Sequence, residues 1–102
     1  MKLWVCIKDG KITGVTALRD DTHICLLFVD KNYQKQGIGR KLIDEAQRYI
    51  INNYSKENSQ LIMTVNSSPY ATEFYHKLGF HDLQKQQEIN GIKFTPMSLT
   101  LH

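Results

Sequence analysis

Apolar and polar residues alternate along the first part of the chain with the two-residue period of β-strands. Residues 3–7 place an apolar side chain at every second position, and the turn pair Asp9-Gly10 separates them from a second strand-like stretch over residues 12–19. After a further polar turn, residues 24–29 are apolar throughout, which is typical of a buried strand. The pattern therefore predicts three antiparallel strands, the third of which lies inside a sheet.

The apolar spacing then changes to that of an amphipathic helix. Beyond residue 37, apolar residues recur three or four positions apart on one side, and charged residues take the other side. The apolar positions are Ile38, Leu42, Ile43, Ala46, Tyr49 and Ile50. We expect an α-helix that packs this stripe on the sheet and leads into a polar connector over residues 52–60.

Residues 61–65 predict another buried strand, and the helical crossover before it makes this strand parallel to the central one. The sequence Ser67-Ser68-Pro69 is typical of a helix start, because Ser caps free N–H groups and Pro fits the first turn. Gly79 is typical of a helix end. A second helix is therefore expected between these signals.

The last part of the chain predicts a closing hairpin. Residues 81–89 and 92–101 alternate weakly and are joined by Asn90-Gly91, a pair that favours a tight hairpin turn. Pro96 indicates an edge or a bulge in the second arm. The predicted fold class is α/β (α+β), with the order β-β-β-α-β-α-β-β in a mixed, largely antiparallel sheet with two helices.

Composition limits the function without defining it. The chain has 102 residues and no linker-like stretch, so we expect one domain over residues 1–102. Its formal net charge is +3 without any block of like charge, so we expect no nucleic acid partner. It has neither a membrane-spanning stretch nor the apolar region of a signal peptide, so we expect no membrane partner and a cytoplasmic location.

The residue types that serve metal or covalent chemistry form no pattern. Cys6 and Cys25 fall in expected strands without a C-x-x-C spacing, so we expect buried free thiols in a reducing compartment. The histidines are scattered, which argues against a metal site. They are His23, His76, His81 and His102.

The junction between the central strand and the first helix has the features of an anion site. Gly37 and Gly39 lie where a helix begins, and free N–H groups with the helix dipole favour phosphate there. Arg40 and Lys41 are unfavourable in a first helical turn unless an anion is bound. The spacing does not fit the Walker loop, and the dinucleotide fingerprint needs a third glycine where this chain has Leu42. A turn whose glycines serve only close packing is the alternative.

Two motifs resemble those of the GCN5-related N-acetyltransferases, the GNAT superfamily. Residues 34–39 read Q-x-x-G-x-G after an L-F-V strand end, and NSSPYATEFYHKLGF at residues 66–80 ends in Y-x-K-x-G-F. The resemblance covers nearly the whole chain and implies the acyl-CoA N-acyltransferase fold, with acetyl-CoA (CoA) as co-substrate and no metal. It implies that a primary amine, on a small molecule or a protein, attacks the thioester directly through a tetrahedral intermediate.

The resemblance also assigns the site residues. Backbone groups of Leu27, Phe28 and Val29 match the strand that pairs with pantetheine. Tyr75 matches the general acid that protonates the departing CoA thiolate, a role that suits a phenol with a pKa of ~10; its place in the apolar stripe of a helix leaves a core role as the alternative. The matches to the pyrophosphate loop are Gln34, Lys35, Gln36, Gly37, Ile38, Gly39, Arg40 and Lys41.

The chain also departs from the family pattern. Ser68 stands where many relatives have an Asn that contacts the cofactor, and we keep Ser68 as a cofactor-binding candidate. Some relatives have a Glu as general base in the later strand, where this chain has Met63. His23 is the remaining candidate base.

The family usually begins with a strand and two helices that shape the acceptor site, whereas this chain starts at the expected second strand. Such a short form would expose an apolar face, including Trp4, and we expect a homodimer to cover it; a longer gene product is the alternative. The function expected is an N-acetyltransferase, and the alternative is a non-catalytic CoA-binding module.

Overall fold

The computed structural model describes residues 1–54 and 60–101. Its elements are β1 (Lys2–Lys8), β2 (Lys11–Arg19), β3 (His23–Val29), a 3₁₀ turn (Lys31–Tyr33), α1 (Ile38–Tyr54), β4 (Leu61–Ser67), α2 (Thr72–Lys77), β5 (His81–Asp82), β6 (Gln87–Ile89) and β7 (Ile92–Leu101). The order of strands and helices agrees with the prediction as far as α2. Of the expected connector, residues 52–54 belong to α1 and residues 55–59 lie outside the described part of the chain.

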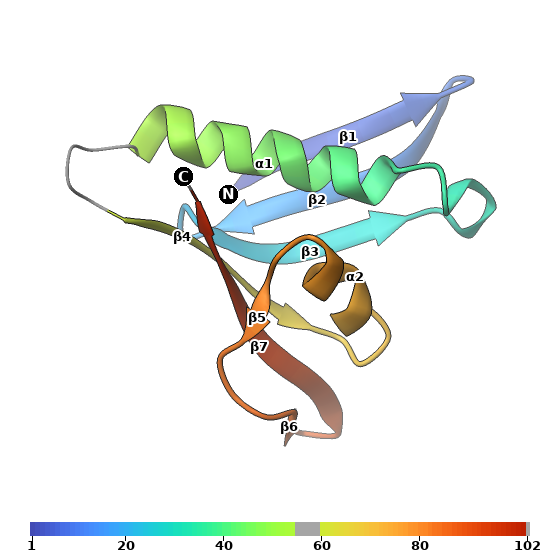
Figure 1. Ribbon diagram of the computed structural model, residues 1–102. Helices are drawn as coiled ribbons and strands as arrows, with labels where there is room; N and C mark the ends of the chain where they lie inside the picture. The colour runs from blue at the N-terminus through green and yellow to red at the C-terminus, as the bar shows by residue number, and fades with distance from the viewer. Residues whose placement is uncertain (55–59, 102) are drawn as a thin grey trace.

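The strands form a mixed sheet in the order β1-β2-β3-β4-β7-β5, with β6 paired to β7 (Figure 1). As predicted, β3 and β4 run parallel because the helical crossover through α1 joins them. The other neighbouring strands pair antiparallel. The fold class expected from the sequence is therefore confirmed.

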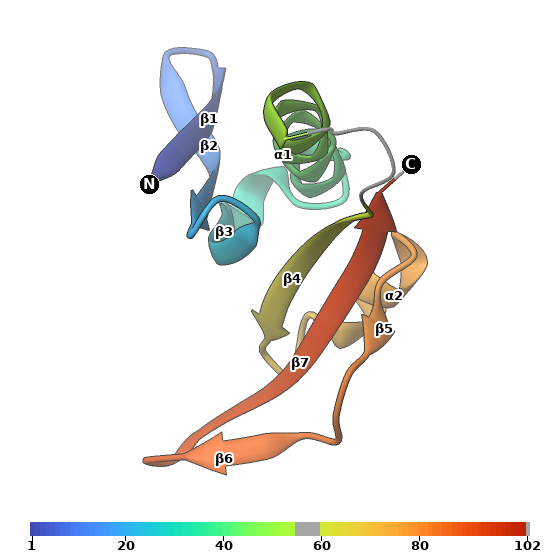
Figure 2. The ribbon, with the colours of Figure 1, turned by 90° about the vertical axis from the view of Figure 1, so that its left-hand side faces the viewer.

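Both helices lie on the same side of the sheet (Figure 2). The apolar stripe of α1 is buried as predicted except at Tyr49, which is partly buried, and Ile43, Ala46 and Ile50 join the core with residues of β4, α2 and β7. Gly14 of β2 lets α1 approach closely, since a Cβ atom there would lie 2.7 Å from Cγ2 of Ile38. No helix in the described residues is both long and apolar enough to cross a membrane.

The opposite face of the β1–β3 part of the sheet is uncovered, which corrects two expectations. The central strand is not buried on both sides, because Leu26 and Phe28 point away from α1 and are about half exposed. Cys25 is exposed and Cys6 is only partly buried, although both are free thiols as expected. The expectation that Trp4 belongs to the exposed face is also wrong, because Trp4 lies on the covered side, where its ring packs edge to face on Tyr49 with 5.4 Å between centroids.

The second helix begins later than predicted. Ser67 is a buried residue of β4, and its hydroxyl donates to the Ser68 carbonyl rather than to a helix terminus. The Ser68 carbonyl in turn accepts from the Ala71 N–H, so residues 68–71 form a turn and α2 starts only at Thr72. A Ser-Pro pair favours a turn as well as a helix start, and here the turn prevails.

The expected first arm of the closing hairpin is divided into β5 and β6. Both pair with β7, on either side of the stretch that contains Pro96. Proline has no N–H to give to a strand ladder, and its carbonyl accepts from the Leu83 N–H instead. The proline that predicted an edge or bulge therefore coincides with the break between the two short strands.

Candidate active site

The parallel strands β3 and β4 separate soon after they meet. They pair only at His23 with Thr64 and at Ile24 with Val65, although β3 continues to Val29. On the other side of β3, Ala17 pairs with Leu26 and Leu18 pairs with Ile24, so Cys25 is an extra residue in a β-bulge. The bulge therefore lies where the two strands diverge, and backbone groups on the β4 side of β3 lose their ladder partners beyond it.

A gap of about 270 Å³ opens between the separated strands. Apolar side chains of β3 form one wall, and the ends of β4 and α2 form the other. The residues that line it are Ile24, Cys25, Leu26, Leu27, Val65, Asn66, Ser68, Ala71 and Tyr75. An extended chain with hydrogen-bonding groups could pair with the free edge of β3 in this gap.

A groove of about 440 Å³ lies at the N-terminus of α1. It is lined by Leu27, Val29, Gln34, Lys35, Gly37, Ile38, Gly39, Arg40, Tyr70, Ala71 and Phe74. Lys35 and Gly37 have left-handed backbone conformations, with φ of 66° and 78°. A Cβ at Gly39 would lie 3.2 Å from the Phe74 ring, so this glycine also permits the close contact between α1 and α2.

The groove suits an anion. The first intrahelical bond of α1 joins the Lys41 N–H to the Gly37 carbonyl, so the N–H groups before Lys41 are free of helical partners. The first turn of α1 contains no acidic residue, and Lys35 and Arg40 supply positive charge at the groove wall. No Cβ fills the space at Gly37, which has nothing within 4 Å of that position. The donors and the space fit a pyrophosphate at this helix end.

The structure brings most of the predicted cofactor residues together, with four qualifications. Phe28 is about half exposed on the uncovered face, and Ile38 is buried in the core so that only its backbone can serve a ligand. Gln36 accepts a hydrogen bond from Lys8 at 3.2 Å and does not line the groove. Lys41 also lies outside the lining.

Several lining residues were not anticipated. Tyr70, Phe74 and Ala71 border the groove, and Asn66 borders the gap. Tyr70 and Ala71 belong to the turn at residues 68–71 and Phe74 follows it in α2, so the position of this turn brings the start of α2 beside the glycine loop. Ala71, Phe74 and Tyr75 recur at helical spacing in the sequence, but an apolar stripe alone does not separate a core wall from a ligand wall.

Tyr75 is held rigidly at the gap. It is 3% exposed, and its ring packs edge to face against Phe74 and Phe80, each with 5.2 Å between centroids. Within the described residues, the Tyr75 hydroxyl has no hydrogen-bond partner, and its oxygen is not fully enclosed by other atoms. Because Tyr75 lines the gap, we infer that this hydroxyl opens toward it. Burial raises the pKa of Tyr75 to about 12, which keeps the phenol protonated.

The raised pKa of Tyr75 makes stability depend on alkaline pH. The unfolded phenol has a pKa of ~10, so its contribution is complete below pH 10 and is lost as the pH rises toward 12. We expect the free energy of unfolding of the wild type to fall between these values by roughly 2 kcal/mol more than that of Tyr75→Phe. Urea unfolding of both proteins at pH 9 and at alkaline pH measures the difference; parallel pH profiles would contradict the assignment.

The candidate base His23 lies at the closed end of the gap. Its Nδ1 atom is 2.8 Å from Oγ1 of Thr64, across the first of the two paired positions of β3 and β4. Burial lowers the pKa of His23, and the nearby Arg19 lowers it further while Asp20 opposes the change. The His23 side chain does not line the gap. Met63, which stands where some relatives have the general base, is fully buried in the core.

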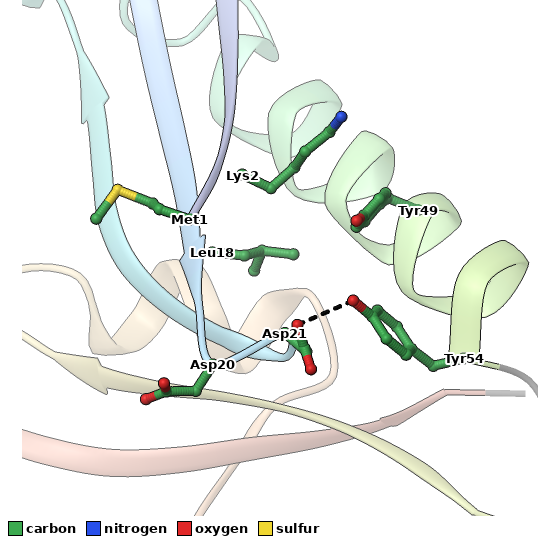
Figure 3. Close-up of a pocket in the computed structure, with 7 residues that line it drawn as sticks. All are labelled: Met1, Lys2, Leu18, Asp20, Asp21, Tyr49 and Tyr54. Atoms are coloured by element: carbon green, nitrogen blue, oxygen red, sulfur yellow. Dashed lines mark hydrogen bonds between the residues drawn. The ribbon is translucent and has the colours of Figure 1, made fainter.

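A third cavity, of about 130 Å³, lies at the opposite end of α1 (Figure 3). Tyr54 donates to Asp21 at 2.9 Å, and the Lys2 ammonium lies 5.1 Å from the centroid of the Tyr49 ring. The hydrogen bond to Asp21 raises the pKa of Tyr54 to about 12. These contacts fasten the end of α1 to the turn between β2 and β3 and to the start of β1, so we assign this pocket a structural role. The described residues contain no group of three metal-binding side chains.

The separated strands, the anion groove and the buried tyrosine are the architecture expected of an acyl-CoA N-acyltransferase. A family model described as an acetyltransferase (GNAT) domain matches residues 1–101. The uncharacterized N-acetyltransferase YafP of Escherichia coli K12 is 30% identical over 95 residues, which are 92% of this chain and 56% of that protein. The chain belongs to the GNAT family of acetyltransferases.

Solved structures share the fold. A GCN5-related N-acetyltransferase from Rhodopseudomonas palustris has a TM-score of 0.84 and 28% identity over 97% of this chain and 61% of that chain. An aminoglycoside 6'-N-acetyltransferase in complex with coenzyme A has a TM-score of 0.76 and 12% identity, over 96% of this chain and 71% of that chain. The chain thus spans less than two thirds of the length of the E. coli and R. palustris proteins.

Proposed function

We propose that the chain is an N-acetyltransferase that transfers acetyl from acetyl-CoA to a primary amine. The observation that carries this proposal is the continuity of the anion groove with the gap, since Leu27 and Ala71 line both. One ligand with a pyrophosphate at one end and an extended thioester arm at the other fits this path. Gly37 to Arg40 would hold the pyrophosphate, and the free edge of β3 would hold the arm.

The residues of the gap support the chemistry in two ways. The acceptor amine attacks the thioester carbonyl, and N–H groups on the β4 side of β3 beyond the bulge could donate to the resulting oxyanion. When the C–S bond breaks, the thiolate leaves with the bonding electrons and takes the proton of the Tyr75 hydroxyl, and the proton that the acceptor nitrogen loses restores the phenol. The raised pKa keeps that proton in place until the thiolate forms.

A non-catalytic CoA-binding module is the second candidate. The observation that favours it is that the lining of the gap contains no carboxylate and no imidazole. The attacking amine must lose a proton, and the described lining supplies only Tyr75 and the thiol of Cys25 for proton transfer. The two candidates share the cofactor and differ only in turnover.

Turnover with a panel of amines distinguishes the two candidates. The panel should contain a lysine peptide, a peptide with a free N-terminus, spermidine and an amino sugar, each incubated with acetyl-CoA. Release of CoA together with mass-spectrometric detection of an acetylated amine supports the enzyme. Binding of acetyl-CoA without any acetylated product across the panel supports the module.

Arg40 and Lys41 offer a matched pair for testing the pyrophosphate site. Both are exposed cations in the first turn of α1, but only Arg40 lines the groove. We expect Arg40→Ala to weaken CoA binding about tenfold or more, because a charge-assisted bond contributes about 1.5–3 kcal/mol, and Lys41→Ala to weaken it less than threefold. Calorimetric titration with CoA measures both. Equal losses would indicate a general charge effect rather than a site at Arg40.

The setting that we propose is the cytoplasm, where free thiols such as Cys6 and the exposed Cys25 remain reduced. We also propose that the protein acts as a homodimer. The acceptor can be a small molecule or a protein, because no side chain in the gap selects among amines by charge.

A further inference from the structure

The uncovered face of β1, β2 and β3 is a continuous apolar surface. We call it the bare face and define it by six side chains that are 44–61% exposed: Leu3, Val5, Ile7, Ile12, Leu26 and Phe28. The strand register places them together, since Leu3 pairs with Ala17, which pairs with Leu26, and Val5 pairs with Val15, which pairs with Phe28. In Figure 2, α1 lies on the other side of these strands.

The bare face is large for the surface of a single chain. Six side chains of this size, each about half exposed, present roughly 600 Å² of apolar area, which is the upper end of what monomers tolerate. A standard interface takes about 800 Å² from each partner. The bare face therefore provides most of the area that one partner contributes to a stable dimer.

The face also carries no charge that would exclude a second copy of itself. Its six residues and their cross-strand neighbours Val15 and Ala17 are all uncharged, and Lys2 points to the other side, toward α1. Arg19 is on the same side of β2, at the end of the strand beyond Ala17, where it is paired with Asp20 at 3.5 Å. Figure 3 shows Lys2 reaching toward the helix. Two-fold symmetry places a patch against the same patch, so an uncharged apolar face is complementary to itself without a charged partner.

The bare face adjoins the gap. Leu26 belongs to the face and also lines the gap, and Cys25 lies beside it in the bulge with its thiol 3.6 Å from the Ala17 carbonyl. Anything that packs on the face therefore comes to lie next to the opening between β3 and β4.

We propose that a second copy of this chain packs on the bare face through a two-fold axis and forms one wall of the acceptor side of the gap. The part of the proposal that concerns the acceptor wall rests on the proposed acetyltransferase function. The dimer interface itself does not depend on that function. The acceptor pocket is then shared between two chains, and the selection of amines depends on residues of both.

The mass in solution tests the interface. Light scattering and sedimentation in the micromolar range should give twice the mass of one chain, and Val5→Lys should give the mass of one chain. Ile92→Lys is the matched control, because Ile92 is 68% exposed on β7 and lies outside the face, and it should remain dimeric. Circular dichroism verifies that both variants fold. A wild type that is monomeric throughout this range overturns the proposal.

Alkylation of the two cysteines tests the wall. Iodoacetamide should modify Cys25 several-fold more slowly in the wild type than in Val5→Lys, while Cys6, which lies on the α1 side, reacts equally in both. Equal rates at Cys25 in a dimeric and a monomeric protein would show that the second copy leaves the gap open. Calorimetric binding of CoA, measured separately, distinguishes this failure from failure of the proposed function, since the anion groove lies on the α1 side.

Discussion

Replacing Gly37 with Asp is expected to weaken acetyl-CoA binding by at least about 100-fold, or about 2.7 kcal/mol. Gly37 has a φ of 78° and empty space around its Cβ position, so a side chain there would enter the groove. The carboxylate would occupy the space of the pyrophosphate and repel it beside the helix N-terminus. Asp is among the residues that tolerate left-handed backbone, so the fold should survive.

Two variants isolate the reason for this loss. Gly91→Asp makes the same change at a φ of 80° with nothing within 4 Å, in the turn between β6 and β7, and should leave binding unchanged. Gly37→Asn has the same shape without the charge and should bind more tightly than Gly37→Asp. If Gly37→Asp bound acetyl-CoA as the wild type does, the loop would be a packing turn and not an anion site.

Replacing Tyr75 with Phe is expected to lower kcat by about 100-fold or more with little change in KM, because general acid catalysis contributes about 10²–10⁴. The change removes one hydroxyl that has no partner among the described residues, and it keeps the ring between Phe74 and Phe80. Stability at neutral pH should therefore be unchanged. The CoA-release assay with the best amine of the panel measures both constants.

The pH profile provides a second readout for Tyr75. Because its pKa is about 12, the wild type should show no loss of activity from deprotonation of this phenol below about pH 11.

Phe80→Leu is a control that alters the packing of the Tyr75 ring but leaves the hydroxyl in place. It should retain most of kcat, whereas a loss equal to that of Tyr75→Phe would point to packing. Wild-type kcat in Tyr75→Phe would make the proton-donor assignment wrong.

The elements of this fold could be predicted where local pattern decides them. The stripe of α1 obeys the helical period strictly, and Ile43, Ala46 and Ile50 are fully buried as that period indicates. The parallel pairing of β3 and β4 followed from a helix between two strands. These features depend on residues close in sequence, or on a general rule of handedness.

The features that define the gap could not be predicted in the same way. The bulge at Cys25 depends on the register between β2 and β3, and a run of apolar residues is compatible with either register. The same apolar run predicted a strand buried on both faces, but Leu26 and Phe28 are about half exposed. Their exposure depends on which face of the sheet the helices cover, and the run itself does not encode this. The late start of α2 goes with the Ser68 carbonyl, which accepts from the Ser67 hydroxyl and from the Ala71 N–H, and this start brings Tyr70 and Phe74 to the groove.

Calorimetric titration of the purified protein with acetyl-CoA and with CoA tests the central claim most directly. The claim is that the N-terminus of α1 and the edge of β3 together hold one CoA molecule. It predicts a single site per chain with micromolar affinity for both ligands. Absence of binding heat, and of competition between acetyl-CoA and CoA for the site, up to millimolar concentration would contradict the claim. It would also contradict the proposed transfer of an acetyl group.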